Sequence, residues 1–300
     1  MFSLLLAFGS AILLGFYDVF KKESLNNNAV LPTLFFASLA GGLIFLACLG
    51  MNVIDPVLMK HARLFIPAMS IEAHLMFFLK TIIVFASWVM AYFAMKNLPL
   101  TITSPIRCSN PVWTLIGAIL IFHETMNLQQ WIGLSLTILF YYLFSLSGEK
   151  EGISFKSNKW VLLMIISTII GSISSLFDKY LVMHFDRVAM QAWYSIYMVP
   201  VTGIVMFIFW YRKRDTMPKF QLRWTIPMIG TFLAVADYLY FWSIDFPGSL
   251  IALISTLRRG SVFVAFLYGA FVFREKNIKM KALIVTGILA GVALIIFGRG

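Results

Sequence analysis

Three arginines lie in stretches of the chain that are otherwise apolar. Arg258 and Arg259 are adjacent in a run from about residue 249 to residue 272, and Arg107 lies in a run at 101–122. About 20 apolar residues are enough to cross a bilayer, and an arginine at that depth costs roughly 2.5–3.5 kcal/mol on insertion scales. Guanidinium groups suit the two-point holding of a carboxylate or a phosphate. We therefore expect anionic partners for these arginines, and a bound anionic solute is one candidate.

Two carboxylates lie in apolar runs as well. Asp237 is in the middle of the run 225–245, and Asp18 is in the run 2–22. Charges buried in membranes often pair, so either aspartate could neutralise an arginine permanently. A second interpretation gives both aspartates a part in proton coupling, in which a carboxylate changes its charge between two states of the protein. For Arg107, only seven residues into its run, a side chain that reaches the membrane surface is a further alternative.

Side chains able to form hydrogen bonds accompany these charges. Ser255 is three residues before Arg258, and Asn110 is three residues after Arg107. We predict that both contact a bound solute together with aromatic residues that offer hydroxyl or indole donors. These aromatic candidates are Trp88, Tyr92, Tyr240 and Trp242. Tyrosine and tryptophan also gather at membrane surfaces, so packing at the interface is the alternative for all four.

The composition sets the class of protein that must position these residues. Of the 300 residues, 60% are hydrophobic and 12% are charged, against about 25% charged in soluble domains. The runs are long and continuously apolar, which favours helices over a barrel. The sequence therefore predicts an all-α, multi-pass integral protein of the cell membrane with ten transmembrane helices. They are expected at about 2–22, 31–50, 74–96, 101–122, 130–146, 160–182, 189–211, 225–245, 249–272 and 279–298.

The two halves of the chain show a weak internal repeat. Arg107 aligns with Arg258 at an offset of 151, and Tyr92 aligns with Tyr240 at an offset of 148. We predict a first five-helix repeat at 1–147, a connecting loop at 148–159 and a second five-helix repeat at 160–300. Because five is odd, the second repeat enters the membrane from the opposite side. Inverted repeats place a shared site near the midplane, and rocking can open it to either face.

A family resemblance follows from the fourth and fifth runs. The segment LPLTITSPIRCSNPVWTLIGAILIFHE is followed, after a polar turn, by QQWIG at 129–133. This pattern resembles the drug/metabolite transporter superfamily and its EamA-type repeat, in which the fourth span ends in an acidic residue followed by Gln and Gly. The second half repeats FPGS at 246–249 and REK at 274–276, but it lacks the matching Gln and Gly. The resemblance covers essentially the whole chain and implies a transporter.

A narrower resemblance concerns the arginines. The sugar-phosphate translocator branch of that superfamily binds phosphate with a basic residue on span four and an adjacent Lys-Arg pair on span nine. Arg107 and the pair Arg258–Arg259 are similar to that trio, although the pair here is Arg-Arg. The resemblance implies an anion-binding role for all three.

Other functions have little support in the sequence. The net charge of +11 is explained by loops that anchor to anionic headgroups, and no basic domain outside the membrane is present to bind nucleic acid. The four histidines have no metal-ligand spacing, and no nucleotide-binding loop or nucleophile motif occurs, so we expect no metal, no cofactor and no enzymatic activity. Gly287 and Gly291 are typical of close helix contacts or of a dimer interface, which leaves a monomer and a homodimer both open.

The orientation of the chain in the membrane is ambiguous. If the N-terminus is cytoplasmic, the cytoplasmic joints carry only Lys60, Arg63, Arg187 and Arg299. The opposite joints carry fifteen basic residues: Lys21, Lys22, Lys96, Lys150, Lys156, Lys159, Arg212, Lys213, Arg214, Lys219, Arg223, Arg274, Lys276, Lys279 and Lys281. The positive-inside rule therefore places both termini outside, whereas the family resemblance implies cytoplasmic termini.

These observations together predict a secondary-active transporter of a small organic metabolite. The preferred hypothesis is a solute that carries a phosphate or a carboxylate and is moved by alternating access. The alternative is an exporter of neutral or zwitterionic metabolites or amino acids, in which the arginines form structural ion pairs.

Overall fold

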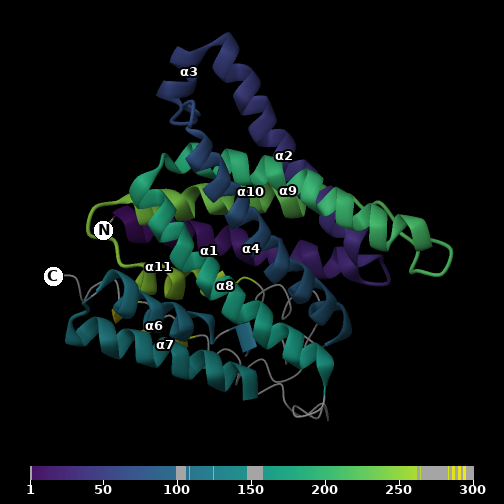
Figure 1. The fold of residues 1–300 in the computed structure, drawn as a ribbon. Coiled ribbons are helices and arrows are strands. Elements are labelled where there is room, and N and C mark those ends of the chain that lie inside the picture. The colour runs from purple at the N-terminus through teal and green to yellow at the C-terminus, as the bar shows by residue number, and fades with distance from the viewer. Residues whose placement is uncertain are drawn as a thin grey trace.

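The computed structural model describes residues 2–98, 106–107, 109–123, 125–146 and 158–261, with scattered positions between 264 and 294. Within these ranges every regular element is a helix (Figure 1). The N-terminal half contains α1 (Phe2–Leu25), α2 (Val30–Ile54), α3 (Pro56–His61), α4 (Ile71–Asn97), α6 (Asn110–Phe122) and α7 (Leu128–Leu146). The C-terminal half contains α8 (Lys159–His184), α9 (Arg187–Phe209), the short 3₁₀ helix η2 (Tyr211–Lys213), α10 (Thr225–Asp245) and α11 (Ile251–Arg258).

The helices follow the apolar runs closely. Among the described residues, five helices are long and apolar enough to cross a membrane, namely α1, α2, α4, α8 and α9 with its extension to Lys213. The predicted spans 101–122 and 249–272 are only partly described, the span 279–298 is described only at scattered positions, and most of the connecting loop lies outside the described residues. The short helix α3 was not predicted. Asp55 begins it by accepting a hydrogen bond from the backbone of Leu58 at 2.9 Å.

Helices of the two halves pack mainly against each other. In Figure 1, α1 lies beside α10, and α4 lies beside α8. Likewise α2 packs against both α9 and α10, α6 packs against α8, and α11 packs against α1. Short polar side chains join α1 to α10 along this contact. Ser243 donates to the carbonyl of Ser3 at 2.8 Å, and the hydroxyls of Ser24 and Thr225 are 2.6 Å apart.

Small residues set the closest approaches between helices. A Cβ atom on Gly230 of α10 would be 2.8 Å from the backbone nitrogen of Gly41 on α2, so the two backbones touch there. This is the close helix contact that such residues favour. A Cβ atom on Gly291 would be 2.9 Å from the carbonyl oxygen of Gly133 on α7. Gly291 therefore packs within its own chain in this structure and is not held open for a dimer partner.

The largest hydrophobic cluster closes one end of the bundle. It gathers the first turns of α1, α4, α9 and α11 with the last turns of α8 and α10, including Leu4, Phe77, Leu181, Ile244 and Ile251. Smaller clusters around Val161 and around Leu25 lie at the opposite end of the helices. The middle of the bundle, between these ends, contains most of the buried charge.

Candidate functional site

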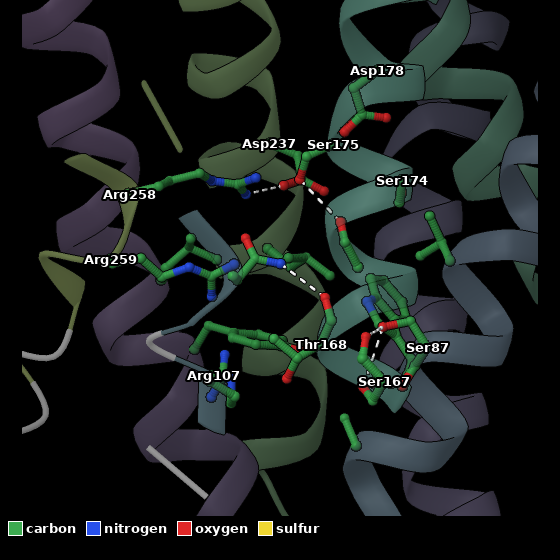
Figure 2. A pocket seen from close by; sticks show the side chains of 18 of the residues that line it. Ser87, Arg107, Ser167, Thr168, Ser174, Ser175, Asp178, Asp237, Arg258 and Arg259 are labelled. Carbon is green, nitrogen blue, oxygen red and sulfur yellow. Dashed lines mark hydrogen bonds and ion pairs between the residues drawn. The ribbon is translucent and has the colours of Figure 1, made fainter. Parts of the chain in front are cut away.

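A cavity of about 180 Å³ lies between the two halves. Figure 2 shows Arg107, Arg258 and Arg259 along one side and hydroxyl residues of α8 along the other. The charged residues that line it are Lys21, Lys80, Arg107, Asp178, Asp237, Arg258 and Arg259. The cavity is therefore lined by polar side chains, although the helices that surround it are mostly apolar.

Arg107 and Arg258, which align in the two halves of the chain, both lie where a helix is interrupted. α11 ends at Arg258, residues 259–260 form a turn, and helix resumes at Ser261. In the other half, residues 106–107 are helical, Ser109 is in a turn, and α6 begins at Asn110. The sequence predicted an uninterrupted run at 249–272, and the structure corrects this because the chain turns at Gly260. Interrupted helices at mid-membrane are the usual setting of solute sites in transporters.

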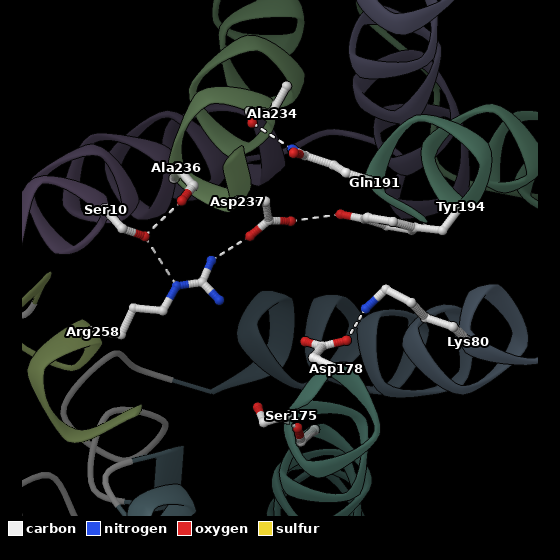
Figure 3. Close-up of polar contacts among 11 residues, drawn as sticks. Ser10, Lys80, Ser175, Asp178, Gln191, Tyr194, Ala234, Ala236, Asp237 and Arg258 are labelled. Carbon is white, nitrogen blue, oxygen red and sulfur yellow. Dashed lines mark hydrogen bonds and ion pairs between the residues drawn. The ribbon is translucent and has the colours of Figure 1, made fainter. Parts of the chain in front are cut away.

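Asp237 on α10 is held by two donors from different helices (Figure 3). Arg258 forms an ion pair with its Oδ1 atom, and the Tyr194 hydroxyl donates to its Oδ2 atom at 2.5 Å. Arg258 also donates from Nε to the hydroxyl of Ser10 at 3.2 Å, and its guanidinium lies 3.9 Å from the centre of the Tyr240 ring. Both oxygens of Asp237 are thus occupied in this structure.

Arg107 forms an ion pair with Asp18 of α1, with Nη1 and Oδ1 3.1 Å apart. The two side chains are 29% and 17% exposed, against 18% and 9% for Arg258 and Asp237. Each arginine therefore pairs with an aspartate from its own half of the chain. The first pair is the more open of the two.

A third ion pair joins Lys80 of α4 to Asp178 of α8 (Figure 3). Both side chains are buried, and both line the cavity. Sequence reasoning missed this pair, although the rule that singled out Asp237 applies to it. Lys80 lies within the apolar run 74–96, and Asp178 lies within the run 160–182.

Lys21, only 3% exposed, is a second cation that sequence reasoning assigned to a loop. Its Nζ atom lies 4.0 Å from the centre of the Tyr92 ring and 3.2 Å from the hydroxyl of Tyr17. Among the described residues it forms no ion pair. Asp18 and Arg107 are near enough to act on it, but they carry opposite charges and are paired with each other.

Hydroxyl and amide groups line the wall formed by α8. Ser87 and Ser167 each donate to the other's carbonyl, at 2.8 and 2.7 Å. Asn110 donates to the carbonyl of Thr168 at 3.1 Å and to the hydroxyl of Ser172 at 2.8 Å, while its own Oδ1 atom is buried without a hydrogen-bond partner. The amide oxygen of Asn110 is thus available to a donor on a bound molecule.

The residues predicted from the sequence divide into two groups. Those that line the cavity are Trp88, Arg107, Asn110, Asp237, Arg258 and Arg259. Those that are absent from its described lining are Asp18, Tyr92, Ser255, Tyr240 and Trp242. Tyr92 and Tyr240 pack against Lys21 and Arg258, so they contact the cations of the site instead.

Trp242 and Ser255 lie elsewhere for clear reasons. Trp242 is near the end of α10, where the guanidinium groups of Arg63 and Arg187 each lie 5.0 Å from its ring centre. Ser255 is 4% exposed within the buried helix α11. Neither position could be told from the apolar pattern, because it does not fix how far each helix is rotated about its axis.

Comparisons with known proteins show which family part of the chain resembles and which fold it shares. Residues 1–146 match the model of the EamA-like transporter family. These residues make up just under half of the chain, and they are similar to that family. No curated protein matches the chain. A solved structure reported as "Crystal structure of protein" has a TM-score of 0.71 at 13% identity, covering 97% of this chain and 95% of that chain, which shows a shared fold.

Members of the EamA-like family are transporters. The similarity of residues 1–146 to this family, together with five described helices long and apolar enough to cross a membrane, agrees with the class predicted from the sequence, a multi-pass membrane transporter of small molecules.

Proposed function

We propose that this EamA-like protein is a secondary-active transporter of a small organic anion, which it carries by alternating access. Lys21 is the observation that carries the proposal. A buried ammonium that faces a cavity without a net compensating charge is costly, and an anionic group on a solute would offset that cost. Arg107, Arg258 and Arg259, which line the same cavity, would add further donors to a carboxylate or a phosphate.

The volume of the cavity limits the size of the solute. An apolar cavity of about 150 Å³ in another protein admits benzene. The cavity of about 180 Å³ in this structure therefore suits a solute of a few carbon atoms with one anionic group. Hydroxyl groups of α8 and the free amide oxygen of Asn110 would bind hydroxyl groups on such a solute.

The packing of helices supports alternating access by an inverted repeat. The contact of α1 with α10 corresponds, with the halves exchanged, to the contact of α8 with α4. Matched contacts of this kind favour two related bundles that rock about a shared site.

A second candidate is a neutral or zwitterionic solute. The ion pairs of Arg107 with Asp18 and of Arg258 with Asp237 favour it, because both arginines already have anionic partners. An amino acid would also find charges of both signs in the cavity. The two candidates differ in what they require of Lys21.

Counterflow in proteoliposomes tests the proposal. Vesicles that contain the purified protein are loaded with one solute, and the entry of the same labelled solute is followed for lactate, pyruvate, inorganic phosphate, alanine and serine. We expect saturable counterflow for at least one of the three anions, its loss in Lys21→Met and its partial retention in Lys21→Arg. Lys22→Met is the matched control, because the neighbouring Lys22 is exposed. Counterflow of the amino acids alone, unaffected by Lys21→Met, would establish the second candidate instead.

A further inference from the structure

The three ion pairs of the cavity differ in which parts of the chain they join. Asp18 and Arg107 both belong to the N-terminal half, and Asp237 and Arg258 both belong to the C-terminal half. Lys80 and Asp178 come from different halves, on α4 and α8. The first two pairs therefore each lie within one half, whereas the third pair joins the two halves across the contact of α4 with α8.

Asp178 depends on this one partner. Among the described residues its only hydrogen bond comes from Lys80, whereas Asp237 receives one on each oxygen. Lys80 is enclosed by the rings of Tyr194 and Phe241, whose centres lie 4.7 and 5.0 Å from its Nζ atom. If the halves move apart at this point, each charge is left buried without compensation, which is strongly unfavourable.

The groups around Asp178 balance in charge. Lys80 on α4, Tyr194 on α9, Asp237 and Tyr240 on α10, and Arg258 on α11 all interact with its carboxylate, and Lys179 follows it on α8. α6 contributes no titratable side chain between Asn110 and Phe122. Lys179 points its ammonium to the carbonyl and hydroxyl of Ser249, at 2.8 and 3.0 Å. The two bases Lys80 and Arg258 thus balance the two acids Asp178 and Asp237, so one added proton creates an excess of one positive charge.

We propose that Lys80 and Asp178 form a proton-coupling site, at which one proton and one anionic group of the solute bind together. The inference rests on the proposed anion transport. The proton binds an oxygen of Asp178, and the ion pair between Asp178 and Lys80 is replaced by one between Lys80 and the anionic group of the solute. The loaded site has the same total charge as the empty one. Release on the other side reverses both steps, and no covalent bond other than the O–H bond forms or breaks.

A pH gradient across proteoliposomes tests this site. The labelled probe is whichever of lactate, pyruvate or inorganic phosphate shows counterflow at equal pH, and a trapped pH-sensitive dye follows protons inside the vesicles. With acid outside, we expect the wild-type protein to accumulate the probe above its external concentration while the interior acidifies. Asp178→Asn should retain counterflow at equal pH and lose the accumulation driven by the gradient. Asp178→Glu should retain both.

Asp18→Asn is the matched control, because it removes a carboxylate whose partner Arg107 lines the cavity and lies in the same half of the chain. It should still respond to the gradient. Gradient-driven accumulation that survives in Asp178→Asn would overturn the coupling site and leave anion transport standing. Absence of counterflow for every anion in the wild-type protein would overturn the proposed function itself. If Asp178→Asn does not fold, as judged by size-exclusion elution, the wild-type protein decides, since counterflow indifferent to the gradient would exclude proton coupling.

Discussion

Arg107 and Arg258 occupy matching positions in the two halves of the chain, yet their surroundings differ. Arg258 is 18% exposed, and it contacts Asp237, Ser10 and the ring of Tyr240. Arg107 is 29% exposed, and it forms an ion pair of 3.1 Å with Asp18. The difference shows that the cavity is tightly enclosed around Arg258 and more open around Arg107. The large hydrophobic cluster beyond Arg258 accounts for the enclosure.

The carboxylates of the two pairs are not equivalent in the repeat. At the offset of 157 that aligns α1 with α8, Asp18 corresponds to Ser175, and at the offset of 148 that aligns α4 with α10, Asp237 corresponds to Val89. The arginines thus match by position, while their partners come from different helices of the repeat. The two ion pairs are therefore not related to each other by the repeat.

The largest effect is expected from Arg258→Met. It leaves Asp237 buried beside a neutral side chain, and breaking a buried pair in this way costs about 3–5 kcal/mol. We expect a clear loss of thermal stability in detergent and no transport. The double variant Asp237→Asn/Arg258→Met should recover most of the stability, because no charge is left unpaired. Transport that also returns in the double variant would argue for a structural pair and a neutral solute.

Tyr194→Phe should have the next largest effect. It removes the hydroxyl that donates to Asp237 at 2.5 Å, and a hydrogen bond to a charged group contributes about 1.5–3 kcal/mol. The thermal midpoint should fall while the ion pair to Arg258 is kept. Tyr197→Phe is the control, since its partly exposed hydroxyl contacts His74 outside the cavity. An equal effect of both variants would show that Tyr194 acts only by packing.

Arg107→Met should destabilise the protein less than Arg258→Met. Its pair with Asp18 is partly exposed, so we expect a loss of about 1–2 kcal/mol, between the values for surface and buried pairs. Thermal unfolding of the two variants under identical conditions checks this order. A reversed order would mean that the Arg107 end is the enclosed one.

Two cysteine variants should have the smallest effect on transport. Their labelling rates test how accessible each end of the cavity is from solution. In a background with Cys48→Ala and Cys108→Ala, a cysteine replaces either Ser109, beside Arg107, or Ser10, beside Arg258. A membrane-impermeant thiol reagent should modify Ser109→Cys faster, because Ser10 is fully buried in this structure. Equal rates would show that the two ends of the cavity are reached equally.

Much of the fold could be predicted, because the length of an apolar run reports directly on a membrane helix. The bounds of α1, α2, α4, α8, α9 and α10 lie within a few residues of the predicted runs. The turn at Gly260 was missed because the run around it stays apolar on both sides. α3 was missed because it is too short to show a period.

The site was predicted in part for the same reason. A charge inside an apolar run stands out, so Arg107, Arg258 and Asp237 were found. Lys80 and Asp178 also lie inside apolar runs, at 74–96 and 160–182, so the same rule applies to them, although they were not singled out. The ion pairs themselves could not be predicted. Which acidic side chain contacts which basic one depends on how each helix is rotated about its axis and on how the helices cross.

The crossing of α2 and α10 has a consequence for any motion of the halves. Gly230 and Gly41 touch backbone to backbone, and these helices belong to opposite halves. Without side chains between them, the two helices can change their crossing angle at this point. The crossing could therefore act as a pivot, and the ends of the helices would move furthest. A methyl group at position 230 would collide with the backbone of α2 at the carbonyl oxygen of Ala37, and should therefore hinder any motion about this crossing.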